Sequence, residues 1–402
     1  MKNMMRDNSL NFKFFNFTIV AAALLLTLSS CIDEYTADIP SDDSNLLVVE
    51  GTICSSQLNK FILTRSQAVN STSQPRMVTG AKVSVHGSDG SEYVAQAADG
   101  YYACSMGELN PNVEYYLHIE TDGEVYESEP QKPMRTEEIA EVSVVQSTPE
   151  SNIEFFVTPE APFDASKANY YSWTYEETWE VHPDYTTDIY FDTRLLAPVY
   201  DPYQFPARGW KNATSTEILV SASHNYEGQQ IRGLKLYDVD RGNERVLFKY
   251  STLVRQRALS KAEYEYELAR RQASSEMGGL FTPLPSALPT NIRCLTSRKH
   301  VIGFVGCALN TAVKRVFVRA MDYSIDRKYP KDARTWLDNC TEQACLRMVQ
   351  VEGMYLCEWR DERYQPNGKL RTAWAYDYQL DVRLKGAYAD EPEFWEEEEL
   401  KN

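Results

Sequence analysis

The chain has little of the residue chemistry that marks familiar enzymes. Only five of its 402 residues are histidines, and none of them has the spacing of metal ligands. The patterns G-x-S-x-G, H-E-x-x-H, the P-loop and G-x-G-x-x-G do not occur. Sequence evidence for a metalloprotease, a serine hydrolase of that type or a nucleotide-binding enzyme is therefore lacking, and we expect no metal or other cofactor. A hydrolase that uses two carboxylates brought together by the fold leaves no such pattern and stays open.

Basic residues and long hydrophobic runs are also scarce. Lys and Arg number 41 against 58 Asp and Glu, which gives a net charge of −17. Nucleic acid is an unfavourable partner for such a chain, because its phosphates would be repelled. The one marked hydrophobic run, residues 17–26, is too short to span a membrane.

That run has the context of an export signal. Three basic residues precede it, as in secretory signal peptides. Leu28-Ser29-Ser30-Cys31 follows and resembles the lipobox of bacterial lipoproteins, in which a cysteine thiol receives a diacylglyceryl group. The resemblance implies that residues 1–30 are a signal peptide and that Cys31 carries the lipid that anchors the chain in the outer membrane. An ordinary signal peptide with a chance cysteine is the alternative.

Residues 31–44 form the next recognisable segment, an acidic tether rich in Ser, Asp and Pro. Acidic residues directly after a lipidated cysteine resemble the surface-export signal of Bacteroidota lipoproteins. The resemblance implies a body exposed on the cell surface, with a periplasm-facing body as the alternative.

The remaining composition favours a mainly β fold of two domains. Tyr is abundant at 26 residues, and aromatic residues favour strands. Residues 45–135 alternate hydrophobic and polar side chains between Asp-Gly turns, which predicts a series of strands. With its Asp99-Gly100-Tyr101 turn the segment resembles small prealbumin-like or immunoglobulin-like β-sandwiches. Residues 136–395 predict a larger antiparallel β-sandwich domain, and residues 396–402 an acidic tail.

Two segments stand out in the larger domain. Tyr170 to Glu180 carries aromatic side chains at 171, 173, 175 and 179, which predicts the strand that anchors the second core. Ser260-Lys261-Ala262-Glu263 is a capping box, so one short helix is expected near 260–273. Further strands are expected at several places, among them 301–308 and 313–320.

Seven cysteines remain once Cys31 is set aside. An exported chain should pair some of them as disulfides, and the odd count leaves at least one thiol free or bonded to another molecule. The pairing cannot be read from the sequence. The spacing of Cys340, Cys345 and Cys357 lacks a paired C-x-x-C, which disfavours zinc.

Several of these segments occur in the order seen in a known family. The matches include Leu47 to Gly51 after the tether, Trp173 to Glu180, the helix after Ser260, Gly278 to Phe281, and Pro392 to Trp395. The chain thus resembles the Bacteroidota lipoprotein family catalogued as domain of unknown function 4249. The resemblance implies a location in the cell envelope and a mainly β architecture. It also implies a gene that often lies beside the gene of a TonB-dependent receptor. Residues 379–382 lack the C-x-x-C that many members carry before the terminal glycine.

A long aromatic segment, residues 182–210, is the candidate binding site. Long loops on rigid sandwiches often carry binding residues. The candidates are Tyr185, Tyr190, Tyr200, Tyr203 and Trp210. The alternative is that the segment folds back over a sheet edge.

We therefore expect a lipid-anchored binding or interaction protein of the outer membrane. Its partners would be the outer-membrane lipid through Cys31 and a TonB-dependent receptor or envelope complex, with a small-molecule ligand unknown. The alternatives are a surface carbohydrate or peptide hydrolase, and a structural adhesin-like spacer.

Overall fold

The computed structural model describes residues 45–67, 75–164, 166–167, 169–275, 288–328, 331–366 and 368–396. The predicted signal peptide, Cys31, the tether, most of the acidic tail and the Gly278 to Phe281 match lie outside these residues. Within them, no helix is both long enough and hydrophobic enough to cross a membrane.

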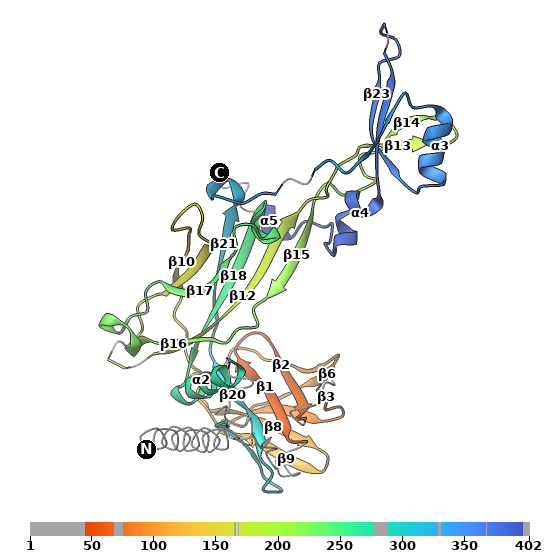
Figure 1. Ribbon diagram of the computed structural model, residues 1–402. Helices are drawn as coiled ribbons and strands as arrows, with labels where there is room; N and C mark the ends of the chain where they lie inside the picture. The colour runs from red at the N-terminus through yellow and green to blue at the C-terminus, as the bar shows by residue number, and fades with distance from the viewer. Residues whose placement is uncertain are drawn as a thin grey trace, which may run out of the picture. The chain divides into compact units, whose positions relative to one another are not determined.

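Most described segments are strands, so the predicted mainly β fold is confirmed (Figure 1). The three largest of four hydrophobic clusters organise them, and each of the three lies against its own set of sheets. We call these parts the first sandwich, the second sandwich and the third lobe.

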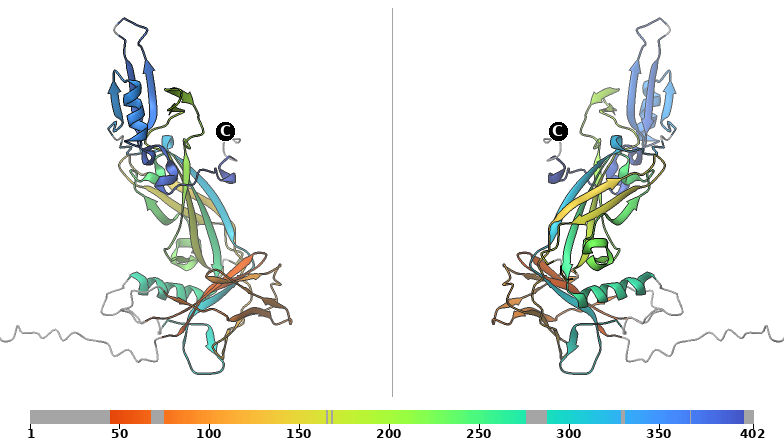
Figure 2. Two further views of the ribbon diagram at one scale, coloured as in Figure 1. Left: turned by 90° about the vertical axis from the view of Figure 1, so that its right-hand side faces the viewer. Right: turned by 90° about the vertical axis from the view of Figure 1, so that its left-hand side faces the viewer.

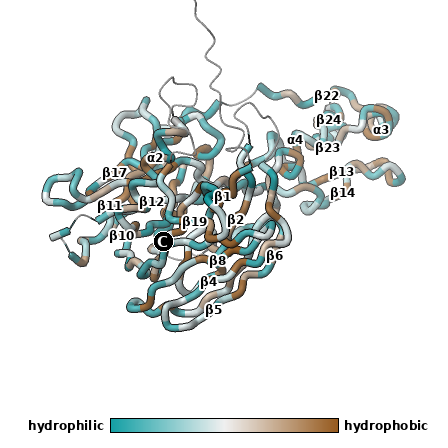
Figure 3. Tube along the Cα trace, turned by 90° about the horizontal axis from the view of Figure 1, so that it is seen from below, coloured by the Kyte–Doolittle hydropathy of each residue, from teal (hydrophilic) through white to brown (hydrophobic). Residues whose placement is uncertain are grey.

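The first sandwich contains two sheets. One has the order β20 (Val301–Ala308), β1 (Leu47–Cys54), β2 (Leu58–Arg65), β7 (Tyr101–Ser105) and β6 (Gln96–Ala98), with β3 (Arg76–Met77) beside β2. The other has the order β19 (Ile292–Cys294), β9 (Glu124–Ser128), β8 (Tyr115–Thr121), β4 (Lys82–Gly87) and β5 (Glu92–Val94). Buried and partly exposed residues alternate along β8, as expected when one face of a sheet is buried, and Figure 3 shows hydrophobic and hydrophilic residues along the strands of this sandwich.

Strand β20 joins the first sandwich through a parallel pair with β1. Leu47 is opposite Val301, and the pairing continues to Cys54 opposite Ala308. Gly303 allows this close approach: its φ is +131°, and a Cβ there would meet the Val49 carbonyl oxygen at 2.1 Å. The first sandwich thus includes residues 292–308, which the sequence-based division assigned to the larger domain.

The second sandwich also contains two sheets. The smaller has the order β10 (Ile139–Val145), β11 (Ile153–Pro159) and β17 (Leu234–Val239). The larger has the order β15 (Gly209–Thr214), β12 (Tyr170–Val181), β18 (Lys249–Leu259) and β21 (Ala312–Arg319), with β16 (Leu219–Ala222) beside β12. Tyr171, Trp173, Tyr175 and Trp179 of β12 are all buried in this core, so the prediction that this strand anchors it is confirmed.

Helix α2 (Lys261–Ser275) is the helix predicted near 260–273. The Ser260 side chain accepts a hydrogen bond from the Glu263 amide at 3.2 Å, which is the serine half of the expected capping box. The Glu263 carboxylate pairs with Arg257 of β18 at 2.7 Å. Tyr266 packs on Phe304 of β20, so α2 contacts strands of both sandwiches (Figure 2).

The third lobe is defined here as residues 183–208 together with 331–381. It contains the hairpin β13 (Ile189–Asp192) and β14 (Ala197–Tyr200), and a sheet of β22 (Thr335–Asp338), β24 (Leu370–Ala375) and β23 (Tyr355–Asp361). Helices α3 (Glu342–Gln350) and α4 (Asp377–Leu380) complete it, and α5 (Glu393–Glu396) follows near the end of the described chain. Short 3-10 turns occur at η2 (Ser223–Asn225), η3 (Glu227–Gln229), η4 (Glu244–Val246), η6 (Ala320–Asp322) and η7 (Val382–Lys385).

Candidate interaction surface

The candidate residues from segment 182–210 have different environments in the structure. Trp210 is 2% exposed and contacts the ring of Trp395, so it is a core residue. Tyr190 is half-buried in β13, whereas Tyr200 and Tyr203 are exposed at 69% and 92%. The middle of the segment forms the β13–β14 hairpin, and Phe191 packs on Trp374 of β24. Its last residues, Gly209 and Trp210, begin β15, the edge strand that pairs with β12.

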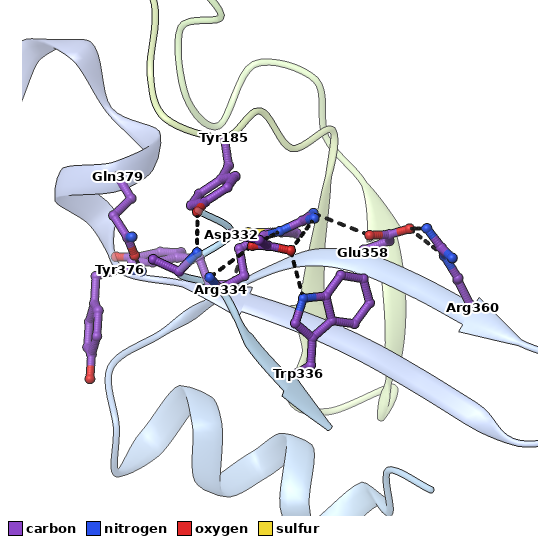
Figure 4. Close-up of polar contacts among 11 residues, drawn as sticks. Tyr185, Asp332, Arg334, Trp336, Glu358, Arg360, Tyr376 and Gln379 are labelled. Atoms are coloured by element: carbon purple, nitrogen blue, oxygen red, sulfur yellow. Dashed lines mark hydrogen bonds and ion pairs between the residues drawn. The ribbon is translucent and has the colours of Figure 1, made fainter. Parts of the chain in front are cut away.

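Tyr185 belongs to a polar cluster on the third lobe, shown in Figure 4. The backbone amide of Ala333 donates to the Tyr185 hydroxyl at 2.6 Å. The guanidinium of Arg334 lies 5.0 Å from the centroid of the Tyr185 ring. Residues 185 and 334 are remote in the sequence, so only the fold brings them together.

The Asp332 carboxylate organises this cluster. Arg334 binds it through two nitrogens, each at 2.9 Å, and the Trp336 indole donates to it at 2.9 Å. These bonds, the Arg334 bond above all, hold the pKa of Asp332 well below its usual range. Arg334 also donates to Glu358 of β23 at 3.2 Å, which links the segment before β22 to the other edge strand of the sheet.

The β register explains why these side chains share one face of the sheet. Trp336 and Glu358 are both opposite Ala373 of β24, while Asp338 and Arg360 are both opposite Arg371. Residues two apart on a strand project to the same side, so the face carries an alternating set of aromatic and charged groups. The other face supplies Leu337, Leu356 and Trp374 to the third core.

Trp336 is the centre of a group of arginines on this face. The guanidiniums of Arg371, Arg334 and Arg360 lie 4.4, 4.9 and 5.7 Å from its ring centroid. Cation–π contacts of this kind contribute about 0.5–1 kcal/mol each at exposed sites. Each arginine is also paired with a carboxylate, Arg371 with Asp338, Arg334 with Asp332, and Arg360 with Glu358. We call this face the Trp336 surface.

The third lobe also carries the exposed tyrosines of the described chain. Five described tyrosines are classed as exposed, and all five belong to this lobe: Tyr200, Tyr203, Tyr364, Tyr376 and Tyr378. Tyr364 is 82% exposed between β23 and β24, and Tyr376 and Tyr378 stack at 5.8 Å. Large amphipathic rings left in water are a feature of binding surfaces.

Sequence reasoning missed most of this surface. It named Tyr185, Tyr200 and Tyr203, but not Asp332, Arg334, Trp336, Arg360 or Arg371. One signal was present: Asp332, Arg334 and Trp336 alternate along the chain, which places an acid, a base and an aromatic on one side of an extended segment. Among the described residues, no group of three or more His, Cys, Asp or Glu side chains could hold a metal ion.

A family model described as "Domain of unknown function (DUF4249)" matches residues 32–313. The chain belongs to this family. The match confirms the family predicted from the sequence and ends before β22, so the Trp336 sheet follows the matched segment.

Two further comparisons were made. No curated protein matches the chain. A crystal structure of a Salmonella alpha-2-macroglobulin mutant is similar over 54% of this chain and 14% of that chain, with 13% identity and a TM-score of 0.17. The chain thus spans about a seventh of the length of that structure, and a likeness this weak carries no argument.

Proposed function

We propose that the protein is a lipid-anchored binding protein of the outer membrane, attached through Cys31, whose third lobe docks a protein partner. The single observation that carries the docking role is that every described tyrosine classed as exposed belongs to this lobe. Tyr, Trp and Arg are the residues that most often dominate the energy of protein interfaces. The anchoring part of the proposal rests on the lipobox and the acidic tether.

The partner class is a membrane receptor, with a TonB-dependent receptor as the first candidate from the family resemblance. The Trp336 surface suits such a partner because its arginines are already oriented by carboxylates and aromatic rings. Side chains held in place before binding lose less entropy when a partner docks. The bound partner would exclude water from the Trp336 ring and its guanidiniums, which strengthens each cation–π contact.

Affinity purification tests both parts of the proposal. The full chain would be isolated from detergent-solubilised outer membrane, and the retained proteins would be identified by mass spectrometry. We expect one receptor near a one-to-one ratio, and we expect it to be lost with Cys31→Ala. A Tyr203→Ser/Tyr364→Ser variant should lose the receptor while remaining lipidated.

The matched control places the same change on another part of the molecule. Leu58 and Val94 of the first sandwich are 53% and 67% exposed, so Leu58→Ser/Val94→Ser also removes two exposed hydrophobic side chains. This variant should retain the receptor. Equal loss in both variants would contradict a specific role for the third lobe, and recovery of no stoichiometric protein by the native chain would contradict the docking role itself.

A hydrolase remains the second candidate because one cavity contains two carboxylates. Glu217 and Glu267 line a cavity of about 300 Å³ bounded by β12, β16, β18 and α2. Burial raises the pKa of Glu267, although its hydrogen bond from Arg270 at 2.9 Å opposes the shift. Two carboxyl groups that flank the scissile bond are the residues that most glycoside hydrolases use.

Sugar release from a panel of polysaccharides tests this second candidate. Glu217→Gln and Glu267→Gln should each abolish any hydrolysis, whereas Glu265→Gln should leave it unchanged. Glu265 is the matched control because it lies on the same helix with an exposed side chain paired to Lys261. Absence of turnover by the native chain, or turnover that survives both cavity variants, would exclude this function.

A further inference from the structure

Two cysteines of the third lobe lie in contact. Cys340 follows β22, and Cys345 is in the first half of α3. Their Sγ atoms are 2.8 Å apart, and both side chains are buried in the third core. Backbone hydrogen bonds fix both positions, because the Cys340 amide donates to Leu370 at 2.9 Å and the Cys345 amide donates to Thr341 at 3.0 Å.

The other described cysteines have different neighbours. Cys294 contacts the hydroxyl of Ser297, and the Cys104 and Cys357 thiols donate to backbone carbonyls. Cys54 and Cys307 are on the paired strands β1 and β20, but Cys54 is opposite Ala308 and Cys307 is opposite Ile53. Neighbouring positions along a strand project to opposite faces, so these two thiols point away from each other.

We propose that Cys340 and Cys345 are joined by a disulfide bond that fixes the N-terminal turn of α3 to the strands of the third lobe. Each thiol loses its hydrogen, one S–S bond forms, and the two electrons and two protons pass to a thiol–disulfide oxidant whose own disulfide becomes two thiols. The proposal rests on the proposed function, because an exported chain meets an oxidising compartment that supplies such an oxidant.

The environment of the pair determines when the bond can form. Burial, together with the neighbouring Cys340, raises the pKa of the Cys345 thiol to about 12. Disulfide exchange requires a thiolate, so a buried thiol of this kind reacts slowly. The bond therefore forms during folding, before the third core closes, and the closed core then protects it from reductants.

The bond has a consequence for the Trp336 surface. Cys345 and Met348 of α3 belong to the same core as Leu337 and Trp374, which lie on the inner face of the sheet. Trp336 and Arg371 lie on the outer face of the same strands. Fixing α3 to the sheet thus holds in place the strands that orient the Trp336 surface.

Peptide mapping tests the proposal directly. Arg334 and Arg347 are trypsin sites, so both thiols fall in the single peptide of residues 335–347. The full chain from the membrane fraction would be denatured in iodoacetamide and digested with and without prior reduction. Without reduction we expect this peptide to lack both alkyl groups and to be lighter by two hydrogens; after reduction it should carry two.

The same digest separates failure of the disulfide from failure of the proposed function. The N-terminal peptide shows whether Cys31 carries lipid, and Cys294, whose side chain is partly exposed, should be alkylated without reduction. Alkylation of Cys340 and Cys345 without reduction would overturn the disulfide, whatever the state of Cys31. An unlipidated Cys31 with an intact disulfide would overturn the anchor alone.

Variants give a second measurement. Cys340→Ser/Cys345→Ser should increase proteolytic cleavage at Arg347 at least several-fold relative to the native chain. Cys357→Ser removes a different thiol from β23 and should leave cleavage at Arg347 unchanged. Equal cleavage in the native chain and the double variant would contradict a role for the bond in holding α3.

Discussion

The second sandwich and the third lobe use the same residue type in opposite ways. In the second sandwich Tyr171, Tyr175, Tyr237 and Tyr250 are buried, and the Tyr237 and Tyr250 hydroxyls lie 2.7 Å apart. In the third lobe the tyrosines classed as exposed project into water. A high tyrosine count therefore indicates neither a core nor a binding surface by itself, and the partner available to each hydroxyl distinguishes the two.

The buried tyrosines are tied into a polar network. The Tyr250 hydroxyl donates to Glu177 at 2.8 Å, and Arg245 donates to both oxygens of that carboxylate at 3.0 Å. Tyr237 stacks on Tyr175 at 3.9 Å and on Phe155 at 4.5 Å. The Tyr237 and Tyr250 hydroxyls thus each have a partner, which is the condition for burying a tyrosine without a large free-energy cost.

The largest expected loss of stability comes from removing a core tryptophan, and it should exceed the loss from removing a surface tryptophan. Trp173→Ala removes a 1% exposed ring from the second core and should lower the free energy of unfolding by about 3–5 kcal/mol. Trp336→Ala removes a ring from the third-lobe surface and should cost less, about 1.5–3 kcal/mol, because three cation–π contacts of about 0.5–1 kcal/mol each are lost. Urea denaturation measures both, and equal losses would contradict the division between core and surface.

The next effect concerns ion pairs in the two regions. Arg245→Met leaves Glu177, whose side chain is 4% exposed, without its charged partner and should destabilise the fold by about 3 kcal/mol. Arg360→Met leaves Glu358 with Arg334 as a partner and should cost no more than about 1 kcal/mol. Chemical denaturation of both variants checks the ranking, and a costlier Arg360 change would refute it.

Alkaline pH should act on the buried tyrosines. Burial raises the pKa of Tyr175 from about 10 to about 12, and it raises the pKa of Tyr237 and Tyr250 further in the same direction. Because the folded state holds these protons more tightly than the unfolded state, their contribution to stability is full below pH about 10 and declines as pH rises toward about 12 and above.

Tyrosinate absorbance and circular dichroism recorded together measure this effect. The last part of the absorbance increase should coincide with loss of the folded signal. Tyr175→Phe keeps the ring and removes one of the titrating groups, so it should weaken the decline. Complete tyrosinate formation in a protein that remains folded would contradict the burial of these hydroxyls.

The smallest expected effect on stability is at the exposed tyrosines. Tyr203→Ser should change the free energy of unfolding by less than about 0.5 kcal/mol, because the side chain is 92% exposed. The same change should reduce recovery of the partner in the affinity experiment. A large loss of stability would show that Tyr203 has a structural role, and the binding result could then no longer be assigned to the surface.

Local sequence patterns predicted individual strands and the start of α2 well. They did not predict which strands pair with one another. The parity of Tyr171, Trp173 and Tyr175 was sufficient to predict a buried strand, and Ser260 with Glu263 located the start of α2. Residues 301–308 also read as a strand, but its sequence carries no mark of a parallel partner near the N-terminus. The sequence pattern shows that one face of a strand is hydrophobic, and it does not show which strand lies beside it.

Contacts between residues remote in the sequence also limited the prediction of the candidate site. Trp210 and Tyr203 have similar sequence surroundings, yet one is core and the other is exposed. The difference depends on Trp395, which approaches Trp210 from the far end of the chain. Likewise, the contact between Cys340 and Cys345 depends on the turn into α3, where Thr341 caps the helix. Sequence spacing alone leaves this pairing undetermined among seven thiols.

Most of the second sandwich, β10 to β18 without β21, lies in the chain between the early strands of the first sandwich and β20, together with the β13–β14 hairpin. In a chain that emerges from its N-terminus, strands β1, β2, β6 and β7 are released long before β20, which completes their sheet. The sheet of the first sandwich therefore stays incomplete, with the edge of β1 open, while the intervening part of the chain folds. An open edge of this kind invites pairing with other chains, so the chain is exposed to aggregation until β20 pairs with β1.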